Sequence, residues 1–181
     1  MKIAVIENQD ETATAMKKIL KRGGYEVTLF TGNEDTGSIV TEIQKNNLAI
    51  LDIELEKESG IHILKKLRKV DRSFPVILIM ACLSPESIIE ASQFGVREML
   101  QKPLDYEELL NTVRKCDMLS RDVVDTTEGL DGDNFIGSYK TMGDIYRKIG
   151  IAAANGLNVM LIGETGVGKE LVARQIHAFS D

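Results

Sequence analysis

The sequence predicts an α/β fold with a doubly wound parallel sheet over residues 1–119. Five short apolar runs alternate there with helical patterns, as in sheets whose strands are joined by helices. Three of these runs are continuously apolar, which is typical of strands covered on both faces. The 181 residues, 43% of them apolar, carry a net charge of −6, and this composition indicates a soluble globular chain.

The expected strands differ in how completely they are buried. The second run alternates apolar and polar residues, so it fits an edge of the sheet. The runs are, in chain order, Ile3–Ile6, Tyr25–Phe30, Leu48–Ile53, Val76–Met80 and Arg97–Leu100. Five strand and helix units of this kind predict one flavodoxin-like (βα)5 domain.

The intervening helices have recognisable ends and faces. Gly23-Gly24 stops the first helix, and Ser84-Pro85 supplies a cap and a first-turn proline for the fourth. Asp105 with Glu108 is typical of a capping box at the start of the fifth. The third helix carries one apolar stripe, formed by Ile61, Leu64 and Leu67.

Acidic and amide side chains follow two of the expected strands. In a flavodoxin-like order the first and third strands are neighbours, and the loops at their carboxyl ends share one crevice. We therefore expect Glu7, Asn8 and Asp52 to converge there.

The N-terminal region resembles the receiver domain of two-component response regulators. Gly60 stands eight residues after Asp52, and Lys102-Pro103 follows the fifth strand, as in that family. The resemblance implies a sensor histidine kinase as partner, Mg²⁺ as cofactor and a Lys102-Pro103 bond that is often cis. It also implies Asp52 as phosphoacceptor, Lys102 as the conserved lysine, and a metal site formed by Asp52, Glu7, Asn8 and the backbone carbonyl of Glu54.

The expected chemistry explains these residue types. A carboxylate that attacks phosphorus must have its own charge and that of the phosphoryl oxygens neutralised by Mg²⁺ and a lysine. Magnesium is usually held by one or two carboxylates with carbonyl oxygens and water.

Four positions depart from the receiver pattern. Glu7-Asn8 replaces an Asp-Asp pair, and Glu56 replaces a common loop proline. Met80 stands where receivers carry Thr or Ser, and its thioether cannot donate a hydrogen bond. Met99 stands where a Tyr or Phe is usual. The alternative function is therefore a phosphorylation-independent pseudo-receiver that acts as a dimerisation and interaction module.

A glycine-rich loop near the C-terminus predicts a nucleotide site. It lies between an expected buried strand, Asn158–Ile162, and an expected helix, Leu171–His177. In that setting backbone N–H groups and the helix N-terminus face phosphate oxygens, and a lysine reaches the outer phosphates. The residues expected to bind the ATP phosphates are Gly163, Glu164, Thr165, Gly166, Val167, Gly168, Lys169 and Glu170.

Residues 134–181 resemble the start of the AAA+ ATPase domain of sigma-54-dependent activators. Glu170, in place of Ser or Thr, and the sequence that follows it are features of that family, as are Asn134–Ser138, Met142 and Ile145–Arg147. The resemblance implies sigma-54 RNA polymerase and DNA as partners of domains beyond this segment, and a homodimer through the receiver and linker. Residues 120–133 are expected to form that linker, helical at first. A rival hypothesis, a small P-loop kinase, depends on residues 163–170 alone.

Several classes of function are disfavoured. The N-terminus enters a strand at once and no apolar run is long enough for a membrane span, so we expect a cytoplasmic protein. The acidic balance argues against DNA binding by this segment, and we expect it neither to hydrolyse ATP nor to bind DNA specifically by itself. Cys82 and Cys116 lack metal-type spacing and are expected to be reduced packing residues.

Overall fold

The computed structural model describes residues 1–81, 84–121 and 138–180, and it divides into two compact units. Within the described residues, the first unit comprises residues 1–81 and 96–121, and the second comprises residues 84–95 and 138–180. Each unit has its own internal packing.

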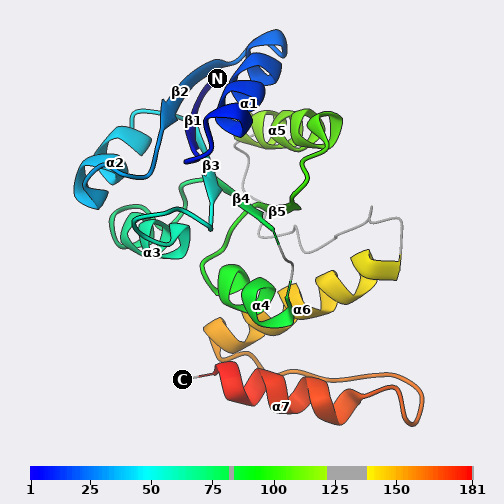
Figure 1. The fold of residues 1–181 in the computed structure, drawn as a ribbon. Coiled ribbons are helices and arrows are strands. Elements are labelled where there is room, and N and C mark those ends of the chain that lie inside the picture. Colours follow the sequence, from blue (N-terminus) through cyan, green and yellow to red (C-terminus); the bar gives the residue numbers. More distant parts are fainter. Residues whose placement is uncertain (82–83, 122–137, 181) are drawn as a thin grey trace. The chain divides into compact units, whose positions relative to one another are not determined.

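The first unit is built on the predicted five-stranded parallel sheet, in the order β2-β1-β3-β4-β5. The strands are β1 (Lys2–Ile6), β2 (Glu26–Phe30), β3 (Leu48–Asp52), β4 (Val76–Met80) and β5 (Glu98–Gln101). The expected runs match these bounds to within one residue, and β2 lies at an edge as its alternating pattern predicted. Figure 1 shows α1 (Asp10–Arg22) and α5 (Tyr106–Arg121) on one face of the sheet, with α2 (Thr36–Ile43) and α3 (Gly60–Val70) on the other.

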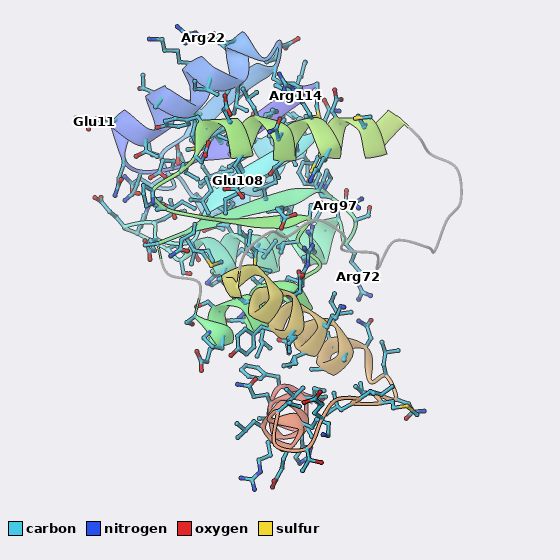
Figure 2. All side chains as sticks on the ribbon, turned by 90° about the vertical axis from the view of Figure 1, so that its right-hand side faces the viewer. Glu11, Arg22, Arg72, Arg97, Glu108 and Arg114 are labelled. Atoms are coloured by element: carbon cyan, nitrogen blue, oxygen red, sulfur yellow. The ribbon has the colours of Figure 1, made fainter. Side chains whose placement is uncertain are left out.

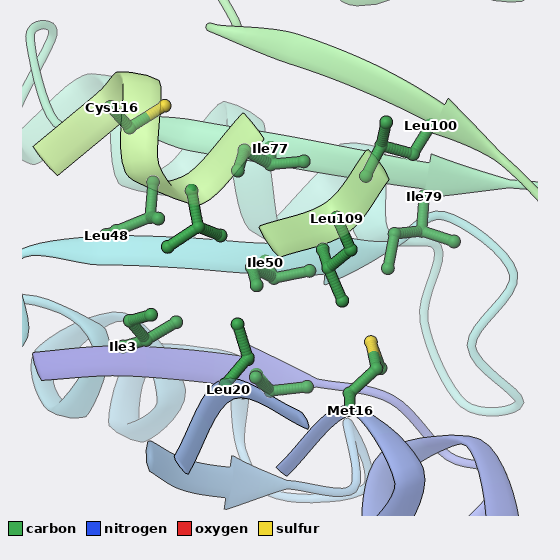
Figure 3. Close-up of a cluster of buried hydrophobic side chains, with 12 residues drawn as sticks. Ile3, Met16, Leu20, Leu48, Ile50, Ile77, Ile79, Leu100, Leu109 and Cys116 are labelled. Atoms are coloured by element: carbon green, nitrogen blue, oxygen red, sulfur yellow. The ribbon is translucent and has the colours of Figure 1, made fainter. Parts of the chain in front are cut away.

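One apolar cluster of this unit lies between the sheet and the α1–α5 layer, and further buried side chains of α2 and α3 cover the other face. Figure 3 shows side chains of β1, β3 and β4 meeting those of the two helices. Members that are fully buried include Ile3, Ile50, Ile79, Met16 and Leu109. Cys116 belongs to the same cluster as a buried cysteine outside any disulfide, and burial raises the pKa of its thiol. This agrees with the packing role expected for it, whereas Cys82 lies outside the described residues.

The ends of α1 and α5 follow the predicted signals, whereas the predicted buried face of α3 needs one correction. Gly23 caps α1, and Gly24 follows with a φ of 88°. Asp105 accepts hydrogen bonds from the N–H groups of Glu107 and Glu108 in the first turn of α5. On α3 the predicted stripe is only partly right, because Ile63 is fully buried beside Leu64 and Leu67 while Ile61 is half-buried.

Charges at the ends of α1 complement the helix dipole. Asp10 and Glu11 lie in the first turn, and Lys21 and Arg22 lie in the last. Figure 2 shows Glu11 and Arg22 near opposite ends of this helix. Acidic groups at the N-terminus and basic groups at the C-terminus each stabilise a helix by about 0.3–1 kcal/mol.

The described residues of the second unit include three helices and the glycine-rich loop. Its helices are α4 (Pro85–Gln93), α6 (Ser138–Asn155) and α7 (Lys169–Phe179). The Ser84 hydroxyl caps α4 by accepting from the Ser87 N–H, as predicted. The described helix α5 runs to Arg121, which agrees with a helical start to the linker; the rest of the expected linker and residues 134–137 lie outside the described residues.

The predicted buried strand at Asn158–Ile162 is wrong. These residues have no assigned secondary structure, and the side chains of Met160 and Ile162 are 82% and 88% exposed. An apolar run becomes a strand only when neighbouring strands complete its hydrogen bonds. Within the described residues none pairs with this run, since all five strands belong to the first unit.

No helix in the described part of the chain is both long and apolar enough to cross a membrane.

Candidate phosphoacceptor and nucleotide sites

The carboxyl ends of β1 and β3 bring the candidate phosphoacceptor site together. The two strands are paired in parallel, with Ile6 opposite Leu51, so the residues that follow Ile6 lie beside the end of β3. Asp52 is the last residue of β3 and is fully buried, and Glu7 is 2% exposed. Burying two carboxylates next to each other is costly unless a cation accompanies them.

Lys102 provides that cation. Its Nζ lies 2.6 Å from Asp52 Oδ2 and 3.1 Å from Glu7 Oε2. The Lys102 N–H donates to the Met80 carbonyl, and the Lys102-Pro103 bond is cis, as the receiver resemblance implied. Burial opposes the charge, but the hydrogen bond to Asp52 and the attraction of the Glu7 carboxylate prevail and raise the pKa of Lys102. The lysine therefore stays protonated between the two acids.

Each carboxylate has a second anchor on the backbone. Asp52 Oδ1 accepts the Glu54 N–H at 3.0 Å, and Glu7 Oε1 accepts the Gln9 N–H at 3.0 Å. Burial, together with repulsion from Asp52, raises the pKa of Glu7 despite the hydrogen bond from the Gln9 N–H and the attraction of Lys102. Glu7 is therefore the group that is harder to ionise in this pocket than in water.

The oxygen atoms available here fit a magnesium ion. Two buried oxygens, Glu7 Oε2 and Asn8 Oδ1, have no hydrogen-bond partner, and Lys102 approaches Glu7 Oε2 only as an ion pair. Hard oxygen donors with one or two carboxylates are the ligands that Mg²⁺ prefers. Among the described residues no group of three or more His, Cys, Asp or Glu side chains could hold a metal, so any ion here depends on amide and carbonyl oxygens as well.

Gly60 allows the loop after β3 to close against Asp52. A Cβ on Gly60 would lie 2.0 Å from the Asp52 carbonyl oxygen, which no side chain could tolerate without a shift of the backbone. The Gly60 N–H also donates to the Ile53 carbonyl at 3.0 Å. This close approach is the physical reason for a glycine eight residues after the acid.

The positions that depart from the receiver pattern offer no hydroxyl. Met80 is 2% exposed at the end of β4, Met99 is half-buried on β5, and Glu56 is exposed in the loop after β3. A thioether is at most a weak acceptor, so neither methionine can donate to a phosphoryl oxygen.

Sequence reasoning missed a cluster that ties the loop after β3 to α2. The Thr36 hydroxyl donates to Glu58 Oε2, while His62 Nδ1 lies 3.0 Å from Glu58 Oε1. Lys57 Nζ also donates to the Asn33 carbonyl at 2.8 Å. A β-branched hydroxyl at one helix start and an acid 22 residues later carry no local signal, because their meeting depends on how α2 and α3 pack.

The glycine-rich loop enters α7 through two glycines with positive φ. Gly166 and Gly168 have φ values of 86° and 93°, and α7 begins at Lys169. Lys169 Nζ donates to the carbonyls of Gly163 and Glu164, at 2.9 and 2.6 Å. Glu170 pairs with Arg174 at 2.7 Å on the exposed side of α7. The lysine thus folds back over the loop that would receive phosphates; Thr165 and Val167 lie exposed within it.

Comparison with known families matches both regions. Residues 3–114 match the response regulator receiver domain, and residues 135–181 match the sigma-54 interaction domain. The chain is 29% identical over 180 residues to the transcriptional regulatory protein ZraR of Escherichia coli K12, covering 98% of this chain and 41% of that protein. It is 32% identical over 181 residues to the DNA-binding transcriptional regulator NtrC of a Bradyrhizobium species, covering 97% of this chain and 38% of that one.

Among solved structures, the receiver domain of the Francisella response regulator 1452 superposes with a TM-score of 0.59 at 26% identity, covering 66% of this chain and 98% of that domain. The chain spans about two fifths of the length of the curated relatives it matches. A receiver model that covers most of the chain, followed by part of a sigma-54 interaction domain, defines its family. The chain belongs to the two-component response regulators of the sigma-54 activator type.

Proposed function

We propose that this chain receives a phosphoryl group on Asp52 from the phosphohistidine of a sensor kinase. The observation that carries the proposal is the Asp52–Lys102 pair, 2.6 Å apart in a buried pocket beside Glu7. A fixed lysine next to a buried carboxylate supplies charge where phosphoryl oxygens would gather.

The transfer needs one bond made and one broken. An Asp52 carboxylate oxygen forms the new P–O bond while the P–N bond to the kinase histidine breaks, and the bonding electrons leave with the imidazole. The Glu54 N–H holds Asp52 Oδ1, and Lys102 neutralises the charge that builds up. Asp52, Glu7, Asn8 and the Glu54 carbonyl would hold Mg²⁺, which supplies further positive charge to the phosphoryl oxygens.

Intact mass spectrometry after incubation with Mg²⁺ and acetyl phosphate tests this proposal. We expect a gain of one phosphoryl group that is absent in Asp52→Ala and retained in Asp10→Ala, an exposed aspartate that begins α1. A gain that persists in Asp52→Ala, or no gain in the unaltered chain, would contradict it.

The second candidate function is a phosphorylation-independent interaction module. It is favoured by Met80 and Met99, which offer no donor, and by Lys102, which already pairs with both acids. Under this alternative, Mg²⁺ with acetyl phosphate changes neither the mass nor the oligomeric state of the chain. A phosphoryl gain accompanied by a change in oligomeric state would exclude it.

We further infer that the glycine-rich loop holds ATP phosphates in a complete ATPase domain that acts on sigma-54 RNA polymerase, with DNA contacted by other domains. The positive φ values at Gly166 and Gly168 and the position of Lys169 support this role. Such an activator would work in the bacterial cytoplasm as a homodimer formed through the receiver and linker. Binding of a fluorescent ATP analogue to a chain extended through the whole ATPase domain, lost in Lys169→Ala and kept in Lys148→Ala, tests the site.

A further inference from the structure

The loop between β3 and α3 carries two backbone groups of the candidate phosphoacceptor site. Residues 53–59 form this loop, and they follow Asp52, the last residue of β3. The Glu54 N–H donates to Asp52 Oδ1 at 3.0 Å, and the Glu54 carbonyl is the backbone oxygen expected to hold Mg²⁺. Whatever fixes this loop therefore fixes the orientation of the Asp52 carboxylate together with one expected ligand of the metal.

Leu55 anchors the loop against the neighbouring loop between β2 and α2. Its side chain is buried, although Glu54 and Glu56 on either side of it are exposed. A Cβ on Gly32 would lie 2.8 Å from a methyl group of Leu55, so the leucine occupies the space that a side chain there would take. Gly32 has a φ of 76°, a backbone conformation that favours glycine. The two loops are thus in direct apolar contact.

Two polar contacts join the same loop to the β2–α2 region. Lys57 Nζ donates to the Asn33 carbonyl at 2.8 Å. The hydroxyl of Thr36, a buried residue that begins α2, donates to Glu58 Oε2. A buried hydroxyl that loses its acceptor is costly, so this contact is worth more than one at the surface. The term loop clamp is used below for three contacts: Leu55 with Gly32, Lys57 with Asn33, and Glu58 with Thr36.

Glu58 also contacts α3, the helix that the loop enters. His62 Nδ1 lies 3.0 Å from Glu58 Oε1, and Lys66 Nζ lies 3.8 Å from the same oxygen. One carboxylate therefore joins the loop to the start of α2 and to α3 at once. Such a link restricts the path that residues 53–59 can take.

We propose that Thr36, Lys57 and Glu58 are positioning residues for the phosphoacceptor site. They hold the loop so that the Glu54 N–H stays on Asp52 while the Glu54 carbonyl stays available to Mg²⁺. The inference rests on the function proposed for Asp52, because the metal serves phosphoryl transfer there. Removing groups that orient metal ligands from outside the site typically weakens metal binding by roughly 10–100-fold.

Magnesium titration of the 181-residue chain, followed by NMR of the Glu54 amide, tests the inference. We expect Thr36→Val to raise the Kd for Mg²⁺ about tenfold, because valine has the shape of threonine but cannot donate to Glu58. Thr36→Ser keeps the hydroxyl and should restore the Kd. Thr41→Val is the matched control on the same helix, where the hydroxyl donates to the Gly37 carbonyl, and it should leave the Kd unchanged.

The same spectra give a second readout in the presence of a chelator. In Thr36→Val the Glu54 amide proton should shift upfield, because its hydrogen bond to Asp52 weakens as the loop loosens. Thr36→Ser and Thr41→Val should leave this resonance in place. A purely structural role of Thr36 would lower stability without moving either the Kd or the resonance of the folded chain.

Lys57→Met covers the case in which Thr36→Val fails to fold. Lys57 is exposed, so its loss does not disturb the core. Loss of a positive charge by itself favours Mg²⁺ binding. A higher Kd in Lys57→Met therefore reports a loosened loop and supports the inference, whereas an equal or lower Kd overturns it.

Two further outcomes would also overturn the inference. One is an equal Kd in Thr36→Val and Thr41→Val, and the other is no Mg²⁺ binding by the unaltered chain. Phosphorylation by acetyl phosphate is measured separately. If the Kd values follow the expected pattern but Asp52 gains no phosphoryl group, the loop clamp positions a metal site and the function proposed for Asp52 is the part that fails.

Discussion

Two five-residue segments rich in apolar side chains adopt different structures in this chain. Val76–Met80 forms β4, with exposures of 0–2%, whereas Asn158–Ile162 remains irregular and leaves Met160 82% exposed. Both runs look like buried strands in the sequence. The difference shows that apolar content makes a segment able to be a strand, while its neighbours decide whether it becomes one.

Strand β4 has a paired strand on each side. It pairs with β3 on one side and β5 on the other, so its backbone groups are satisfied in both directions. None of the described strands pairs with residues 158–162. Without such pairing, water remains the partner of the backbone groups.

The largest effect on the free energy of unfolding is expected from side-chain truncations at matched positions in the two segments. Ile79→Ala removes a fully buried side chain from β4 and should lower the free energy of unfolding by about 2–5 kcal/mol. Ile162→Ala removes one that is 88% exposed and should change it by less than about 0.5 kcal/mol. Urea denaturation at fixed pH compares the two, and similar losses would show that residues 158–162 are buried in solution.

Two glycines in different surroundings, Gly60 and Gly143, extend the comparison from side chains to the backbone. Gly60→Ala places a Cβ 2.0 Å from the Asp52 carbonyl oxygen and should destabilise the chain by about 1–3 kcal/mol through overpacking. Gly143→Ala in α6 meets nothing within 4 Å and should stabilise it by about 0.5–1 kcal/mol through lower unfolded-state entropy. Thermal melts decide the signs, and a gain in Gly60→Ala would mean that the loop after β3 lies farther from Asp52.

The smallest expected effect concerns Glu7 and pH. The folded chain raises the pKa of Glu7, so it binds this proton more tightly than the unfolded chain does. Stability from this group therefore falls as pH rises above the ordinary value of 4.5. Glu7→Gln should then be more stable than the unaltered chain at pH 7, with the difference shrinking as pH falls to 4.5 and below.

Urea midpoints at pH 7 and at pH 4.5, measured with a chelator present, test this expectation. Glutamine keeps an oxygen for the Gln9 N–H, and Lys102 keeps Asp52 as its partner. A lower midpoint for Glu7→Gln at pH 7 would mean that its ion pair with Lys102 outweighs the cost of burial.

The sequence indicated which residues form the candidate site but not how those residues contact one another. Asp52, Glu7 and Lys102 follow strands whose order the sequence pattern indicated, and the structure brings all three together. That Lys102 bridges both acids, and that Glu58 joins Thr36 and His62, depends on distances between separate elements. Those distances are fixed by how loops and helices pack, which no local pattern records.

The sequence by itself determined the strand and helix units, their ends and the chemistry available at the carboxyl edge of the sheet, because periodicity, caps and turn residues act over a few positions. Tertiary structure decided which apolar segments are buried and which buried oxygens of the pocket have no hydrogen-bond partner. It also decided which helix lies against Gly150. Burial and pairing are properties of two segments at once, and they arise only when the folded chain brings those segments into contact.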